Sequence, residues 1–549
     1  METIPPDVRV SGSSTGENPF WTDERVRLAS WMFVALGILL RIVRYALGHP
    51  LWGDEAFLAS NIVERDFLGL TKPLNYVQVS PILFLWVEKG MTLAFGFSVW
   101  SMRFVPIMAS IAGLIVFRHL AAQLVKGPAL ILAVAILAVG YYPIRHGGEI
   151  KPYATDFLTA VSLLAMAVSW LQDRNRNISL WMLVAIGPIA IAMSHPAIFI
   201  AAGVGLVLLV PVLKTKRFVT ILPLMLFGFA TVSVFLLILV TVTKDQSESV
   251  MGTMREFWID AFPPRAGVAL IIWLLRVHTS HMFSYPAGGD RGASTMTTVC
   301  FLVGWLAMYR RGSRPILALL LMPFGLGLLA AFLGRYPYGG SARTMQYVAP
   351  SIALLAGLGM SAILSRWPLR LGGARAIFAT IGVLAVVGAG LLGWDIAHPY
   401  KSIYDQASRD FAHVFWEEEA KSAELVCAKS DLGVALDPKS WQSDRSAIYI
   451  CHREIFSGRH RRDEPVRLDR VSETHPLRVV VFGEKPGDAP GVTAWLASMN
   501  RTYLLIDKRE IYVNRGVINR AGSFQDRYVI YDFVPKAASI SELPTSVKR

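Results

Sequence analysis

Long apolar segments recur along the chain from residue 27 to residue 394, and short polar stretches separate them. A helix that crosses a bilayer needs roughly 20 mostly apolar residues. By that measure the pattern predicts about eleven membrane-spanning helices, at 27–47, 103–124, 128–143, 152–171, 178–194, 196–212, 218–242, 293–309, 315–334, 346–365 and 376–394. We therefore expect an all-α polytopic membrane protein.

The basic residues between these segments predict which way the chain crosses the membrane. If the N-terminus is cytoplasmic, five short loops face inward, and each of them carries Lys or Arg. These residues are Arg118, Lys126, Arg174, Arg176, Lys214, Lys216, Arg217, Arg310, Arg311, Arg314, Arg366, Arg370 and Arg375. Inward loops of membrane proteins are enriched in these cations. Residues 1–26 are then a cytoplasmic tail, and residues 27–394 form the transmembrane domain.

Two outward segments, 48–102 and 243–292, are much longer than the others, and long loops tend to carry function. Each contains a semi-apolar stretch, at 81–97 and at 266–283, that charged or histidine side chains interrupt. We expect both stretches to form amphipathic helices at the membrane interface. Residues 395–549 would be an extracytoplasmic soluble domain, and its β-prone runs predict an α/β or α+β fold. These runs are 477–482, 503–506 and 528–533.

The composition supports a membrane protein. Of the 549 residues, 53% are hydrophobic and 17% are charged, and the mean hydropathy is +0.44, which excludes a water-soluble enzyme and a disordered chain. The formal net charge of +14 would suggest nucleic acid as the partner of a soluble protein, but cytoplasmic Lys and Arg explain it here, so we expect no nucleic acid. Three cysteines cannot form a disulfide scaffold, although Cys427 and Cys451 could pair in an extracytoplasmic domain.

The first outward segment begins with two adjacent acids, Asp54 and Glu55. Carboxylates just above hydrocarbon are poorly solvated, which raises a carboxyl pKa or requires a cation partner. A general base could be tuned in such a place. The alternative is structural, because Asp54 also fits the N-cap of the helix that the following apolar periodicity predicts.

A second outward turn concentrates four titratable side chains, those of Arg145, His146, Glu149 and Lys151, just before Tyr153. Ordinary turns do not need so many, which indicates a functional site. The alternative is a self-neutralising group of ion pairs at the membrane surface. As a zinc ligand His146 has little support, because no second His or Cys stands at ligand spacing.

A third outward turn carries Arg335 and Arg343 among tyrosines and glycines. A guanidinium offers two parallel donors and glycine lets backbone amides approach, so this composition suits a phosphate. An aromatic belt with interfacial arginines is the alternative. All three clusters are predicted on the same side of the membrane, with acids in one and cations in two. That arrangement suits group transfer from an anionic lipid at the outer face.

Four short elements follow one another along this region. They are Asp54-Glu55-Ala56, Gln78-Val79-Ser80-Pro81, Arg103-Phe104-Val105-Pro106 and Glu149-Ile150-Lys151-Pro152-Tyr153-Ala154. Their order and topology, over roughly residues 27–365, resemble the GT-C superfamily of integral-membrane glycosyltransferases. Within it they are similar to bacterial proteins of the protein O-mannosyltransferase and lipid A aminoarabinose transferase type.

The resemblance implies a polyprenyl-phosphate-linked sugar as donor, an extracytoplasmic acceptor and inversion at the anomeric carbon. It implies that Asp54 acts as the general base, with Glu55 and Glu149 as further acids of the site. The remaining site residues it implies are Arg343, Lys151, Arg335 and Arg145 for the donor phosphate, and Tyr153, His146 and Gln78 for the acceptor or sugar. No cofactor is certain, but some superfamily members bind a divalent metal, so Mg²⁺ or Mn²⁺ is allowed. The compact size and the lack of eukaryotic retention signals favour a bacterial inner membrane.

Other functions compete with a transferase that moves one sugar. A transporter or flippase for lipid-linked sugars could use the same charges without bond chemistry, but transporters tend to place polar residues at the bilayer midplane and to have related halves. This chain has neither feature. A non-catalytic partner in surface polysaccharide assembly would tolerate neutral residues in place of Asp54 and Glu55. A polymerase or ligase of the O-antigen type would instead take a lipid diphosphate oligosaccharide.

Overall fold

The structure is a computed structural model that describes residues 21–75, 78–244, 246, 258–265, 267–366, 372–398, 424–429, 477–482, 496–497, 499–514 and 525–536. The chain divides into two compact units. The first unit contains residues 1–47, 67–87 and 103–397, and the second contains residues 48–66, 88–102 and 398–549.

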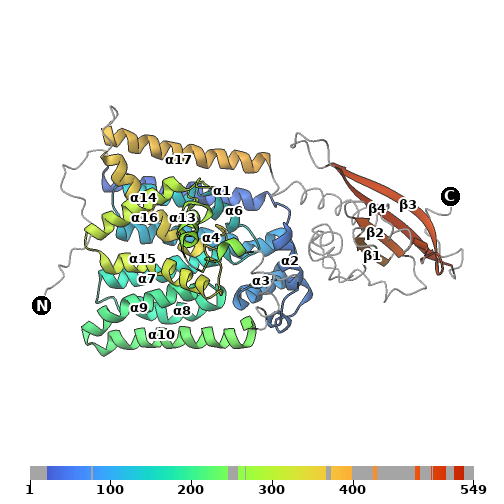
Figure 1. Cartoon of the computed structure of the whole chain (residues 1–549), viewed down its shortest axis with the longest axis horizontal. Helices are drawn as coiled ribbons and strands as arrows, with labels where there is room; N and C mark the ends of the chain where they lie inside the picture. Colours follow the sequence, from blue (N-terminus) through green and yellow to red (C-terminus); the bar gives the residue numbers. More distant parts are fainter. Residues whose placement is uncertain are drawn as a thin grey trace. The chain divides into compact units, whose positions relative to one another are not determined.

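Nearly all described elements of the first unit are helices (Figure 1). They are α1 (Asp23–Ala46), α4 (Val99–Leu124), which begins in the second unit, α5 (Pro128–Ala138), α6 (Tyr141–Gly147), α7 (Tyr153–Gln172), α8 (Ile178–Met193), α9 (Ala197–Thr215), α10 (Phe218–Ile238), α13 (Val268–Thr279), α14 (Thr295–Arg310), α15 (Arg314–Phe332), α16 (Ala349–Ser365) and α17 (Gly372–Ala397). Short helical turns accompany them at η1 (Gly69–Thr71), η2 (Leu239–Thr243), η3 (Ile259–Ala261), η4 (His281–Phe283) and η5 (Gln346–Val348).

All eleven apolar segments of the sequence form helices, which confirms the all-α polytopic prediction. Within the described residues, eight helices are long and apolar enough to cross a membrane, and α5 with α6, bent by 47°, would make a ninth. The other two segments, α8 and α14, are helices of 16 residues each.

Helix α5 lies at the centre of the first unit. Every residue from Ala129 to Ala138 is buried, as expected for a helix that is apolar all round. Helices α1 and α16 pack against it, and α14 packs on α16. A second group, α7, α8, α9 and α10, lies side by side (Figure 1). The C-terminal end of α5 is followed by α6, so this core supports the turn before α7.

Glycines bring α14 and α16 unusually close together. A Cβ atom on Gly304 would overlap the carbonyl oxygen of Leu355, and one on Gly359 would overlap the carbonyl oxygen of Cys300. Helices in membranes gain stability from such close backbone contact, because lipid tails already satisfy apolar side chains. Cys300 is buried and free. Cys427 lies in the described segment 424–429, but Cys451 lies outside the described residues, so the pairing of these two cysteines stays a prediction.

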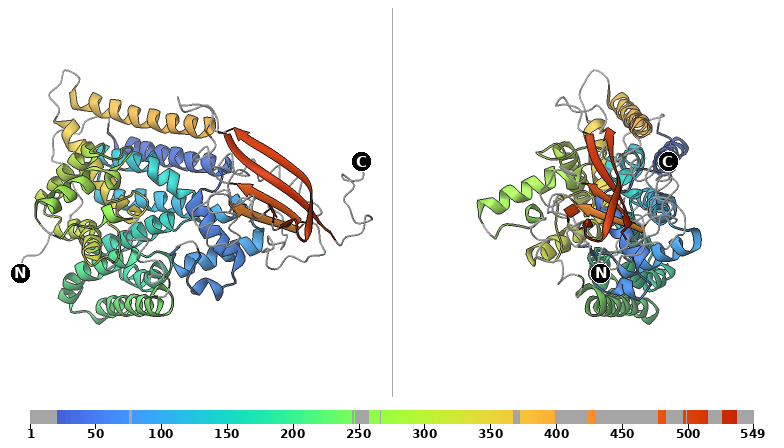
Figure 2. Two further views of the ribbon diagram at one scale, coloured as in Figure 1. Left: turned by 45° about the vertical axis from the view of Figure 1, so that its right-hand side comes forward. Right: turned by 90° about the vertical axis from the view of Figure 1, so that its right-hand side faces the viewer.

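The described part of the C-terminal region contains a four-stranded mixed sheet (Figure 2). Its strands are β1 (Glu424–Lys429), β2 (Leu477–Phe482), β3 (Tyr503–Asn514) and β4 (Gln525–Pro535). The order is β1-β2-β4-β3, with β1 parallel to β2 and the other pairs antiparallel. All three β-prone runs of the sequence are strands, so the α/β or α+β prediction is confirmed.

We expect Gly304→Ala to destabilise the protein by about 1–3 kcal/mol, because the added methyl group must push α14 away from α16. The matched control is Gly228→Ala in α10, where a Cβ atom meets nothing within 4 Å. There the same change should be neutral or stabilise by about 0.5–1 kcal/mol, since alanine is the better helix former. Thermal unfolding of the detergent-solubilised protein measures both. Equal effects of the two variants would show that the α14–α16 contact does not limit stability.

Candidate active site

The turn between α6 and α7 brings together three of the predicted site residues. The Nδ1 atom of His146 lies 3.1 Å from Oε2 of Glu149, and both side chains are almost fully buried. The Tyr153 ring meets the imidazole edge-on, with the ring centroids 5.5 Å apart. A carboxylate at one ring nitrogen fixes the orientation of a histidine. The pair can therefore present a fixed imidazole and a carboxylate to a bound substrate.

A buried cation lies two residues beyond this pair. The Nζ atom of Lys151 donates a hydrogen bond of 2.5 Å to Oε1 of Gln78, which comes from 73 residues earlier in the chain. Both side chains are less than 9% exposed. The Lys151 backbone N–H also donates to the Glu149 carbonyl oxygen at 2.7 Å, so the turn is tight. Because buried charges need partners, the Gln78 amide helps to hold this ammonium in place.

The Arg145 side chain contacts Tyr141. Its Nη1 atom donates to the hydroxyl of Tyr141 at 2.9 Å, and the guanidinium lies over the same ring. Within the described residues no carboxylate pairs with Arg145. The self-neutralising group of ion pairs therefore does not include it, although His146 and Glu149 do form a pair.

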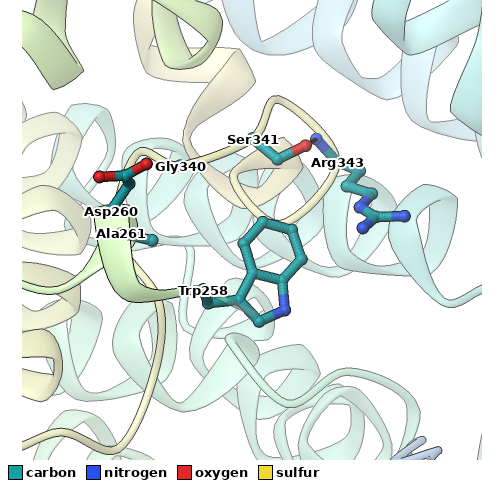
Figure 3. Close-up of a pocket in the computed structure, with 6 residues that line it drawn as sticks. All are labelled: Trp258, Asp260, Ala261, Gly340, Ser341 and Arg343. Atoms are coloured by element: carbon teal, nitrogen blue, oxygen red, sulfur yellow. Dashed lines mark hydrogen bonds between the residues drawn. The ribbon is translucent and has the colours of Figure 1, made fainter. Parts of the chain in front are cut away.

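The third outward turn forms one wall of a pocket of about 310 Å³ (Figure 3). It is lined by Trp258, Asp260, Ala261, Gly340, Ser341 and Arg343. Arg343 is 8% exposed, and its guanidinium carbon lies 4.9 Å from the centroid of the Trp258 ring. A cation over an indole face is favourable, most of all where water is excluded. Arg335 has an exposed side chain and does not line this pocket.

Some residues near these sites were not singled out from the sequence as functional. Trp258 and Asp260 line the Arg343 pocket, and Tyr142 is hydrogen-bonded to His281, which in turn meets Asp290. Four of these five residues lie in the outward segment 243–292. Its length was the only signal in the sequence, because none of the four forms a motif with its chain neighbours.

The two acids of the first outward segment lie in the second unit, at the start of α2 (Gly53–Glu64). The helix has Trp52 as its N-cap, so Asp54 is the second helical residue and the proposal that it caps the helix is wrong. Glu55 reaches back instead, with Oε2 accepting from the Trp52 N–H at 3.4 Å, as in a capping box. Asp54 is half-buried and Glu55 is fully buried.

The predicted interfacial stretch at 81–97 is helical, as α3 (Ile82–Phe95), but its charges are not on a water-facing side. Glu88 is 0% exposed, and no group hydrogen-bonds to either of its carboxyl oxygens in the described part of the chain. Burial raises the pKa of this carboxyl well above its usual range. The adjacent Lys89 caps the end of α2 by donating to the carbonyl oxygens of Ile62 and Val63.

Among the described residues, the candidate site does not bring together a full set of metal ligands. No group of three His, Cys, Asp or Glu side chains within the described ranges could hold a metal ion. His146 and Glu149 would supply two ligands of the kinds that divalent metals accept. Binding of a divalent metal, Mg²⁺ or Mn²⁺, remains a prediction.

No protein-family model and no curated protein sequence matches the chain. Solved structures do. ArnT from Cupriavidus metallidurans, bound to undecaprenyl phosphate, matches with a TM-score of 0.51 at 16% identity, over 91% of this chain and 97% of ArnT. Its apo form matches with the same TM-score and coverage at 15% identity. The apo Archaeoglobus fulgidus oligosaccharyltransferase matches with a TM-score of 0.44 at 13% identity, over 80% of this chain and 64% of that one.

The chain shares the fold of this ArnT structure. The resemblance that four short elements of the sequence indicated is therefore confirmed at the level of the fold. At 16% identity this likeness carries over neither a substrate nor the role of any residue.

We expect Glu88→Gln to make the protein less sensitive to alkaline pH. The folded chain keeps the Glu88 proton above the pH at which the unfolded chain loses it, so wild-type stability falls as pH rises above about 4.5. Glutamine is neutral at every pH and removes this loss. Melting temperatures at pH 5 and pH 8 should therefore differ less in Glu88→Gln than in wild type. The control is Glu64→Gln, at an exposed carboxyl of α2, which should not change the difference.

Proposed function

We propose that this protein is an integral-membrane glycosyltransferase that moves a sugar from a polyprenyl-phosphate donor to an extracytoplasmic acceptor, with inversion at the anomeric carbon. One observation carries the proposal: the fold is that of ArnT over nearly the whole of both chains, and the ArnT crystal structure holds undecaprenyl phosphate. The buried cations Lys151 and Arg343 provide this chain with groups suited to a lipid phosphate.

In the proposed reaction Asp54 removes the proton of an acceptor hydroxyl. The oxygen then attacks the anomeric carbon from the face opposite the phosphate. The bond between that carbon and the phosphate oxygen breaks, and polyprenyl phosphate leaves with the electron pair. Arg343 and Lys151 would offset the charge that develops on the phosphate, since preorganised cations act strongly where water is excluded.

The remaining residues of the site would bind rather than react. Glu149 and His146 offer an acceptor and a second polar group for sugar or acceptor hydroxyls, next to the apolar face of Tyr153. Gln78 would hold Lys151 in its position. Arg145, Arg335 and Glu55 retain only the roles that the resemblance implies.

The proposed orientation places this chemistry at the outer face of a bacterial inner membrane, with the N-terminus in the cytoplasm. Residues 27–394 would form the catalytic domain. We further propose that residues 395–549, to which the resemblance does not extend, select the acceptor together with the long segment 243–292.

We expect Asp54→Asn to slow transfer at least about a hundredfold while donor binding is retained, because the isosteric amide cannot accept the proton. Sugar transfer is measured in membranes that express wild type or variant, with a panel of radiolabelled polyprenyl-phosphate sugars. The control is Asp66→Asn, an exposed acid of the same outward segment, which should retain full activity. If Asp54→Asn is as active as wild type, the base is another group. If wild type consumes no donor, a lipid-linked sugar transporter becomes the better account.

We expect Arg343→Lys to weaken binding of undecaprenyl phosphate about tenfold or more. The substitution retains the charge but loses the paired donors and the contact with Trp258. Titration of the purified protein with undecaprenyl phosphate measures the change. The control is Arg265→Lys, an exposed arginine of the segment 243–292, which should bind as wild type does. Unchanged affinity of Arg343→Lys would remove this residue from the donor site.

A further inference from the structure

Three side chains outside the proposed reaction form a continuous series of polar contacts, a hydrogen bond followed by an ion pair. The hydroxyl of Tyr142, on α6, lies 3.0 Å from Nδ1 of His281. Nε2 of the same imidazole lies 3.2 Å from Oδ1 of Asp290. Tyr142 and His281 are 139 residues apart in the chain, so the series joins α6 to the long outward segment.

The order of the groups determines which ring nitrogen of a neutral His281 carries the proton, and with it the direction of the hydrogen bond to Tyr142. An ionised carboxylate can only accept and it attracts an N–H group, so Nε2 of His281, which lies 3.2 Å from the Asp290 carboxylate, carries the proton. Nδ1 is then left as an acceptor, and the Tyr142 hydroxyl donates to it. Asp290 thereby selects the tautomer, and the tautomer in turn fixes the direction of the Tyr142 hydroxyl.

The loop that carries His281 and Asp290 does not need this series to keep its shape. The Ser284 and Ser294 hydroxyls are hydrogen-bonded to each other at 2.9 Å, and the Ser294 N–H donates to the Thr279 carbonyl oxygen at 3.0 Å. The Tyr141 N–H donates to the Pro286 carbonyl oxygen at 2.8 Å, which ties α6 to the same loop. The series therefore adds little to loop closure. Its main effect is to fix the position of the Tyr142 ring.

The Tyr142 ring forms one wall of the space that holds His146. The Tyr142 and His146 rings are stacked, with centroids 5.6 Å apart and an interplanar angle of 14°. The Tyr153 ring meets His146 edge-on. His146 is the residue paired with Glu149. A rotation of Tyr142 would remove this stacking contact, one of the contacts that hold the imidazole.

We propose that Tyr142, His281 and Asp290 are positioning residues that hold the His146–Glu149 pair in one orientation. The proposal rests on the proposed function, in which that pair contacts the sugar or acceptor. Asp290 acts through His281, His281 acts through Tyr142, and Tyr142 acts through its ring on His146. None of the three needs to touch the substrate.

The test follows the reactivity of His146 itself, so it does not depend on finding a donor. The purified full-length protein in lipid nanodiscs is treated with diethyl pyrocarbonate under single-hit conditions, and mass spectrometry reads the modification of His146. Tyr142→Phe retains the ring but loses the hydroxyl, and Asp290→Asn loses the carboxylate. Each should make His146 react about fivefold faster, the size expected for one lost hydrogen bond.

Two further variants separate positioning from general loosening. Ser294→Ala loosens the loop without touching the series and should leave His146 reactivity within about twofold of wild type. The double variant Tyr142→Phe/Asp290→Asn should match either single variant, because both act through one path. Unchanged reactivity in the single variants, or additive effects in the double variant, would overturn the proposal.

Activity gives a second readout where a donor is known. Tyr142→Phe and Asp290→Asn should then lower kcat about fivefold with little change in the KM for the donor. If no donor is consumed by wild type, the proposed function fails, yet the His146 modification rates still show whether the series positions the pair. The two failures are therefore distinguishable.

Discussion

The scarcity of water where the helices meet determines which partners the buried polar side chains of this protein must have. A charge that is removed from water needs a partner, and in a bundle of apolar helices the partner must come from the chain itself. Arg41, which is fully buried in α1, donates to Ser110 and to the backbone carbonyl oxygens of Gly37 and Ala138. It thereby joins α1 to α4 and α5. The same requirement operates at the candidate site, where buried Lys151 and His146 each have an oxygen partner.

Tight packing of the helices next to the site holds these hydrogen-bonded pairs in place. Helix α5 is buried on every side, and a Cβ atom on Gly357 of α16 would overlap the backbone of Ala133. Such contact leaves α5 little freedom to shift, and α6 begins only three residues after α5 ends. The turn that carries His146, Glu149 and Lys151 is therefore attached to the most constrained helix of the unit. Sites supported in this way keep their geometry when a ligand binds.

The candidate site separates its charges by kind. The pocket of Arg343 and Trp258 offers a cation against an aromatic face, and the turn before α7 offers a carboxylate–imidazole pair beside a lysine. A sugar phosphate carries both an anion and hydroxyl groups, so it suits both arrangements. The long outward segment contributes to each, with Trp258 in the first and His281 beside the second. That segment therefore contributes side chains to both parts of the candidate site, although it contains no recognisable motif.

Hydropathy alone determined the eleven helices, since the length and apolar character of each are local properties of the chain. The strands at 477–482 and 528–533 were predictable for the same reason. The crowding of His146, Glu149 and Lys151 in one turn was also visible, because they are neighbours in sequence. Only the tertiary structure decided that Gln78 meets Lys151 and that Tyr142 meets His281, because these pairs lie 73 and 139 residues apart and depend on how the helices pack. It also placed Glu88 inside the protein, since a pattern of charges along a helix does not show which neighbours cover it.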